Sequence, residues 1–478
     1  GILKVSHPTP RPGTADRRQR WWTTVRESLS GVEHDYTRGP IDRALVLLAI
    51  PMVLEMAMES VFVIADIYFV SSLGAEAVAA VGLTEAVLTL LYAVAIGLGM
   101  ATTAMISRRV GEGRLAEANV AAGQALWIGA ALSIAVGFAG YHGAEWLLTM
   151  MGAEPEVVAI GVGYTSIIFG GAGTIIFLFM INAIFRGAGD PMIAMRALWL
   201  ANGVNLVLDP ILIFGLGPIP AMGVEGAAIA TTIGRGTGVA YQLWCLFGPN
   251  GRVRPGLADL RLTPPVLLRL LRLSAGGIMQ FLIHTASWVV LVRIIAMSGS
   301  VAVAGYTIAI RIIDFTIMPA WGLGNAASTL VGQNLGADRA DRAERSAGRA
   351  VRANVWFLCP AGLLFVIFAE GLVGIFTDDP MVARFGSDAL RIIALGYPVY
   401  AVGMTMVQSF NGAGDTDTPM KINFFVYWVF QIPLAWLLSQ QLGQGPYGAF
   451  YAILAAEGLL ALVGTMIFRR GHWRHRTV

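Results

Sequence analysis

The chain has 478 residues, of which 56% are hydrophobic and 13% are charged, and its formal net charge at pH 7 is +3. Soluble domains carry about 25% charged residues, so this chain has too little polar surface for a water-soluble protein of its length. The small net charge argues against a nucleic-acid partner. Cys245 and Cys359 form no metal or redox motif. We therefore expect a polytopic membrane protein.

The chain begins with a polar, arginine-rich segment, residues 1–39, which lacks the apolar core of a signal peptide and is predicted to be a cytoplasmic tail. Apolar stretches of about 20 residues or more follow, which is the length a helix needs to cross a bilayer. Helices are expected because a bilayer core offers no water to an open strand edge. Twelve spans are predicted, beginning near Ile41, Ala75, Leu115, Val157, Met192, Gly223, Pro265, Val301, Ala343, Met381, Met420 and Tyr447.

Positive charge alternates between the loops. Arginines follow the even-numbered spans, as at Arg108, Arg186 and Arg339, whereas the loops after odd-numbered spans contain almost no lysine or arginine. Short loops rich in lysine and arginine stay in the cytoplasm. Both termini are therefore predicted to be cytoplasmic, in a multi-pass protein of the inner membrane.

The chain repeats itself at an offset of 225 residues. The anchors are Gly97-Leu98-Gly99 with Gly322-Leu323-Gly324, residues 185–190 with 410–415, Gly74 with Gly299, and Pro155 with Pro380. A unit of six spans keeps one orientation, so the halves form a parallel repeat with a cavity between them. The predicted domains are an N-lobe at 40–248, a cytoplasmic linker at 249–264, a C-lobe at 265–470 and a tail at 471–478.

Acidic side chains inside spans are candidate functional residues. Asp66 stands late in the first span among apolar neighbours, where a carboxylate costs roughly 2.5–3.5 kcal/mol to insert. Asn205 and Asp209 are four residues apart in the fifth span and share a helix face. Two carboxylates and an amide suit a proton or Na⁺; a structural polar cluster is the alternative.

The repeat offset confines these groups to the first half of the chain. Adding 225 to Asp66, Asn205 and Asp209 gives Leu291, Phe430 and Leu434, which cannot bind a cation. Cation coupling is therefore expected in the N-lobe alone.

Two further acids share a helix face with Asp66. Glu55 and Glu59 lie in the same span, and Glu59 pairs with His284 at the repeat offset. Glu55, Glu59 and His284 are candidates for lining the cavity between the lobes, with an interlobe hydrogen bond as the alternative.

Several stretches together resemble the multidrug and toxic compound extrusion (MATE) family. They are residues 64–70 (IADIYFV), 186–190 (RGAGD), 205–210 (NLVLDP), 223–231 (GVEGAAIAT) and 331–337 (VGQNLGA). The resemblance implies an all-α membrane protein with two six-helix lobes in a V shape and cation-coupled export of organic compounds. In the family's DinF-like branch an N-lobe cation network falls on Asp66, Asn205, Asp209 and Thr231. Another branch uses a glutamate on the seventh span, where this chain has His284.

The predicted function is secondary active multidrug efflux. The sequence has no phosphate-binding Walker loop, zinc-binding His/Glu pair or nucleophile elbow, so neither an enzyme nor ATP-driven transport is expected. We expect an antiporter that exports organic, often cationic, small molecules in exchange for H⁺ or Na⁺. It should need no cofactor and act as a monomer among membrane lipids. The alternatives are an intramembrane enzyme and a flippase or exporter of lipid-linked or other amphipathic metabolites; a flippase should have a strongly basic cavity.

Overall fold

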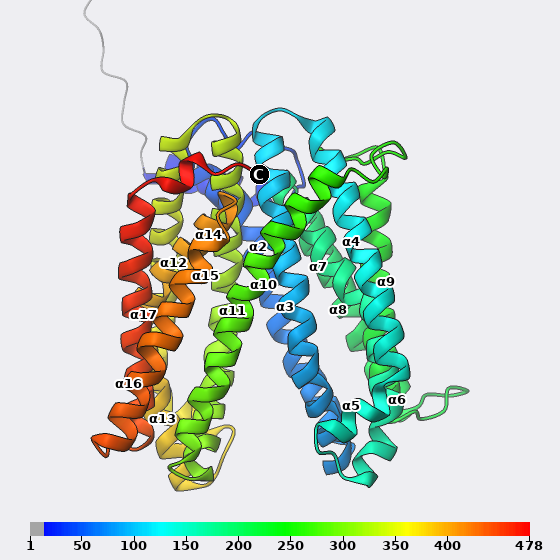
Figure 1. Ribbon diagram of the computed structural model, residues 1–478, viewed down its shortest axis with the longest axis vertical. Coiled ribbons are helices and arrows are strands. Elements are labelled where there is room, and N and C mark those ends of the chain that lie inside the picture. The colour runs from blue at the N-terminus through cyan, green and yellow to red at the C-terminus, as the bar shows by residue number, and fades with distance from the viewer. Residues whose placement is uncertain (1–13) are drawn as a thin grey trace, which may run out of the picture.

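The computed structural model describes residues 14–478, so the first 13 residues of the predicted tail lie outside it. Long helices form two lobes that converge at the end carrying the C-terminus and diverge toward the other end (Figure 1). We call these the closed end and the open end. The predicted all-α fold with two lobes in a V is confirmed.

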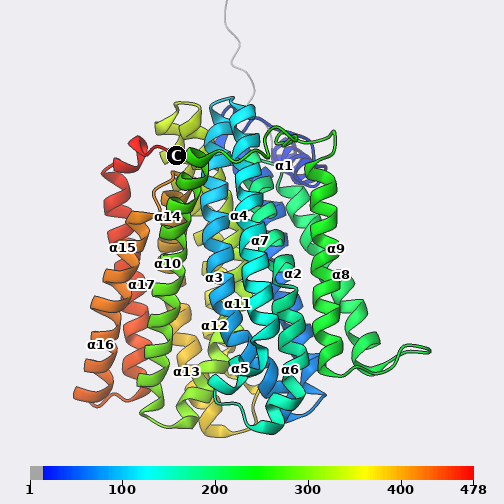
Figure 2. The same ribbon diagram turned by 45° about the vertical axis from the view of Figure 1, so that its right-hand side comes forward.

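The N-lobe contains helices α2–α9, preceded by a separate helix α1 at the closed end (Figure 2). The bounds are α1 Thr14–Ser28, α2 Ile41–Ser71, α3 Ala75–Gly111, α4 Leu115–His142, α5 Ala144–Met150, α6 Pro155–Gly170, α7 Ala172–Ala188, α8 Pro191–Phe214 and α9 Val224–Leu246.

The C-lobe contains α10–α17, and its eleventh span is partly π-helical. The bounds are α10 Pro264–Ala296, α11 Ser300–Gly336, α12 Ala340–Gly374, α13 Pro380–Leu395, α14 Tyr397–Gly412, α15 Asp417–Asn423, α16 Ile432–Trp436 and α17 Pro446–Arg469, with π-helix at Phe424–Gln431 and Leu437–Gln441 and a 3₁₀ turn at His472–His475.

The twelve predicted spans correspond to these helices. By length and apolar content, ten described segments can cross a membrane, or eleven if α13 and α14, bent by 58°, are one span. The twelfth is α9, where Arg235 and Gln242 interrupt the apolar run although both are buried. Each predicted start lies within three residues of the observed helix start.

Glycines bring the lobes into backbone contact toward the closed end. α2 packs on α11, and α10 packs on α3. A Cβ at Gly322 would collide with the carbonyl oxygen of Met52, and one at Gly97 with the backbone of Ile278. Gly97 and Gly322 are 225 residues apart, so the two crossings repeat the same contact.

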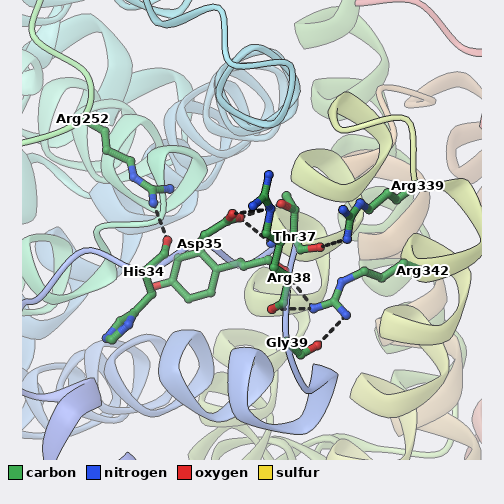
Figure 3. Close-up of polar contacts among 9 residues, drawn as sticks. His34, Asp35, Thr37, Arg38, Gly39, Arg252, Arg339 and Arg342 are labelled. Atoms are coloured by element: carbon green, nitrogen blue, oxygen red, sulfur yellow. Dashed lines mark hydrogen bonds and ion pairs between the residues drawn. The ribbon is translucent and has the colours of Figure 1, made fainter.

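A strap of residues 33–39 lies between arginines of the linker and of the C-lobe (Figure 3). It also contacts the N-lobe, where the Tyr36 hydroxyl donates to the Gly189 carbonyl at 3.1 Å. Arg252, in the linker, donates to the His34 carbonyl. From the C-lobe, Arg339 donates to the Thr37 carbonyl at 2.8 Å and Arg342 to the Gly39 carbonyl at 2.7 Å. Part of the segment predicted to be a tail therefore helps to hold the lobes together.

The repeat offset is not constant along the C-lobe. It is 225 at the helix ends Gly189 and Gly414, which have similar φ of 87° and 79°. The final span of each lobe begins after Gly223 and Gly445, with φ/ψ of 60°/−135° and 60°/−139°, an offset of 222 (445 − 223). The shortening lies in the loop before the final span, which has nine residues in the N-lobe (215–223) and four in the C-lobe (442–445), whereas the spans before it have 24 and 25 residues. Pairing at a fixed offset of 225 therefore fails beyond this loop. Residues 418–456 contain no acid, so the C-lobe has no carboxylate at the position of Asp209.

The lobe crossing predicts opposite effects for two glycine substitutions. Gly322→Ala should lower thermal stability, because a clash with backbone costs about 1–3 kcal/mol when neighbours must move. Gly348→Ala, on α12 where nothing lies within 4 Å of the added carbon, should raise it by up to about 1 kcal/mol. Thermal unfolding of the two purified variants in detergent measures the difference. Equal stability would show that the crossing is not tightly packed.

Candidate cation and substrate site

A cavity of about 600 Å³ lies between the lobes, lined by α2, α3, α6, α7 and α9 on one side and by α10, α11 and α14 on the other. Most of its wall is apolar or aromatic, which suits organic ligands. The charged side chains on the wall are Glu59, Asp66, Glu85, Arg186, Arg235 and Asp314. Four acids against two arginines make the cavity formally negative.

A buried polar cluster of Asn205, Asp209 and Thr231 reaches from the N-lobe wall into the lobe interior. Asp209 is 0% exposed and Asn205 is 2% exposed. When the Asn205 amide nitrogen faces Asp209 it donates to Oδ2 at 2.8 Å, and the amide oxygen accepts from the Thr231 hydroxyl at 3.0 Å and backbone N–H at 2.9 Å. Asp209 Oδ1 has no hydrogen-bond partner among the described residues.

Asp66 connects this cluster to the cavity. It is half-buried on the wall, and Thr231 lines the wall beside it. The charge of Asp66 acts on Asp209 and on Arg235. The structure thus brings together all four predicted cation-site residues, with Asn205 and Asp209 behind the wall and Asp66 and Thr231 on it.

Arg235, which lies four residues after Thr231 on α9, was not predicted from the sequence as a site residue. It is 7% exposed, donates to the Tyr92 hydroxyl at 2.7 Å and lies 5.8 Å from the ring centroids of Phe62 and Tyr92. No ion pair joins it to another described side chain, so its charge is stabilised by aromatic faces and by nearby acids. The sequence feature that could have identified Arg235 is a charged residue inside an apolar span, because such residues are usually functional.

Of the three residues predicted to line the cavity, Glu59 does and Glu55 does not. Glu55 is 1% exposed and accepts from Arg186 at 2.7 Å and from Asn182 at 3.0 Å. The Arg186 guanidinium thus holds it in the N-lobe interior. His284 lines a separate pocket in the C-lobe.

Comparisons with known proteins agree with this architecture. The MatE family profile matches residues 51–211 and again residues 277–437, which together make up more than half of the chain. The chain belongs to the MatE family. The two matches start 226 residues apart (277 − 51), in agreement with the repeat found in the sequence. Members of this family are membrane transporters and not enzymes, as predicted.

Relatives and solved structures cover nearly the whole chain. The probable multidrug resistance protein NorM of Thermotoga maritima is 27% identical over 92% of this chain and 94% of its own length. An FAD transporter of Shewanella oneidensis is 25% identical over 85% of this chain and 90% of its own. A multidrug resistance MATE family transporter solved in an outward-facing conformation is 28% identical, with a TM-score of 0.86 over 91% of this chain and 96% of that one.

The two glutamates of α2 should respond differently to loss of charge. Glu55→Gln leaves the Arg186 guanidinium buried without its counter-charge, which should cost about 3–5 kcal/mol. Glu59→Gln, on the cavity wall with one hydrogen bond from Asn202 at 3.2 Å, should change stability by less than about 1 kcal/mol. Thermal unfolding in detergent compares them; a stable Glu55→Gln protein would contradict the structural role of the ion pair.

Proposed function

We propose that this protein is a secondary active antiporter that exports organic, often cationic, small molecules in exchange for H⁺ or Na⁺. The cation would enter at Asp66, Asn205, Asp209 and Thr231. The protein would act as a monomer in the inner membrane with both termini, and hence the closed end, in the cytoplasm. The cavity would then face outward, in the state from which substrate leaves and the cation enters.

The main support for this proposal is Asp209 Oδ1, a buried carboxylate oxygen with no hydrogen-bond partner among the described residues. A fully buried carboxylate is costly unless it is paired or neutralised. No lysine or arginine bonds it among the described residues, and the charge of Asp66 acts against its own. Protonation of Asp209 would remove this cost, and so would Na⁺ held by its free oxygen and by the Asn205 amide turned so that its oxygen faces the ion.

The choice between H⁺ and Na⁺ depends on oxygen ligands. Among the described residues no three His, Cys, Asp or Glu side chains gather as a metal site. Na⁺ would therefore need amide, hydroxyl or water oxygens in addition to the two carboxylates, whereas a proton would need only one carboxylate.

Energetics require that the exported compound contribute to the cycle. Shifting a conformational equilibrium from 1:99 to 99:1 takes roughly 5.5 kcal/mol. A membrane potential of about 100 mV supplies roughly 2.3 kcal/mol for each charge moved. One entering cation is therefore insufficient on the potential alone, and preferential binding of substrate to one conformation would supply the remainder.

Export of amphipathic metabolites is the second candidate. The similarity to an FAD transporter favours it, because that name specifies an anionic, phosphate-bearing compound. The cavity favours organic cations, because four acids face it against two arginines, and Arg186 is paired with Glu55. A flippase for lipid-linked sugars would need a basic cavity, which this one is not.

Removing the titrating group of the first acid should uncouple transport. Asp66→Asn keeps size and removes the charge, so efflux of an organic cation from vesicles should no longer respond to a pH gradient or a Na⁺ gradient. Imposing each gradient separately on the wild type identifies the coupling ion. Wild-type efflux by a folded Asp66→Asn protein would contradict the proposed coupling role.

The second acid should behave in the same way, and its C-lobe counterpart should not. Asp209→Asn should abolish gradient-driven efflux, whereas Leu434→Val in the eleventh span should leave it near the wild-type rate. The reason is that residues 418–456, which include Leu434 and most of the eleventh span, contain no acid. Equal losses in both variants, with both proteins folded, would show that the two lobes share the coupling.

A further inference from the structure

A second pocket, of about 350 Å³, lies inside the C-lobe between α10, α11, α14 and α17. It shares Thr89, Asp314 and Ile317 with the central cavity, so the two spaces adjoin. The cation site proposed above does not use it.

Aromatic rings form much of its wall, and hydrogen bonds hold several of them in place. Trp288 Nε1 donates to the Tyr306 hydroxyl at 3.1 Å, and the Tyr397 hydroxyl lies 2.7 Å from that of Thr316. Tyr400 and Tyr427 complete the set. Rings fixed before a ligand arrives reduce the ordering cost of binding it.

A buried carboxylate faces this pocket without a cationic partner. Glu457, on α17, is 7% exposed; its Oε1 accepts from the Tyr427 hydroxyl at 3.1 Å, and its Oε2 has no partner among the described residues. Asp314 is the second acid on the wall and makes no ion pair within residues 18–478. No lysine or arginine lines the pocket. His284, whose ring lies 4.7 Å from that of Tyr427, is the one side chain on its wall that can carry a positive charge.

The internal repeat places Glu457 where the N-lobe has a buried arginine. At the offset of 222 that relates α9 to α17, Glu457 corresponds to Arg235 (457 − 222). Both residues are 7% exposed. The N-lobe therefore carries its own cation at this helix position, against aromatic rings, whereas the C-lobe has an anion beside aromatic rings and no cation to match it.

We propose that the C-lobe pocket is a binding site for a monovalent organic ammonium ion, with Glu457 as its counter-charge and the tyrosine and tryptophan rings as its walls. Aromatic faces attract alkylated ammonium groups, which lose little hydration on entry. The contact of the pocket with the central cavity gives such a ligand a route in. The inference rests on the proposed function, since it specifies where an exported organic cation would bind.

Equilibrium binding of tetraethylammonium to the full chain, purified in detergent with no gradient, tests the assignment. Glu457→Gln should weaken the affinity about tenfold or more. Tyr400→Leu should weaken it severalfold, and Tyr400→Phe, which restores the ring, should recover most of that loss. The matched control is Tyr451→Leu, an exposed position on α17, the helix that carries Glu457. This variant should bind tetraethylammonium like the wild type. The Tyr400 pair keeps the test decisive if Glu457→Gln does not fold.

The outcomes separate this inference from the proposed function. Unchanged affinity in Glu457→Gln and Tyr400→Leu, with a loss in Asp66→Asn, would place the ammonium ion in the central cavity and overturn the C-lobe site while leaving cation-coupled export intact. Absence of tetraethylammonium binding to the wild type would also overturn it. Loss of binding in Glu457→Gln would support the site even if vesicle efflux proved independent of both gradients.

Discussion

Close backbone contact between the lobes at one end is the constraint on which the rest of the structure depends. Glycine at Gly97 and Gly322 lets α3 meet α10 and lets α11 meet α2 without intervening side chains. Arg252 of the linker and Arg339 and Arg342 of the C-lobe then bind carbonyl groups of the strap at residues 33–39. Helices held together at one end diverge at the other (Figure 1), and the cavity with its acids lies in the space between them.

The two lobes share a backbone plan and differ in their charges. The N-lobe has Asp66 and Asp209 with Arg235 nearby, whereas the C-lobe has Glu457 and Asp314 among aromatic rings. Such a division would let one lobe hold a small coupling cation and the other a larger organic one, on opposite sides of a shared cavity. Because like charges entering adjoining spaces repel, binding at one site would weaken binding at the other.

The fold was predictable because its signals are local and repeated. Span length, alternating loop charge and the glycine anchors each depend on a few neighbouring residues, so they predicted twelve membrane spans in two lobes. Asp66, Asn205, Asp209 and Thr231 were also found, partly through family resemblance. Glu55 was misplaced because helix periodicity does not show that Arg186 reaches it from another helix. The Glu457 pocket was missed because a shorter loop before α17 changes the repeat offset to 222, which hid the correspondence of Glu457 with Arg235.

Mutual exclusion between the coupling cation and the organic cation can be measured directly. Tetraethylammonium affinity of the purified wild type should be measured in an acidic and in an alkaline buffer, each with and without Na⁺, and then repeated with Asp209→Asn. We expect the coupling ion to lower wild-type affinity at least fivefold, within the usual range of about 5–150-fold for coupling between sites, and Asp209→Asn to remove the effect. The same wild-type affinity in all four conditions would contradict it.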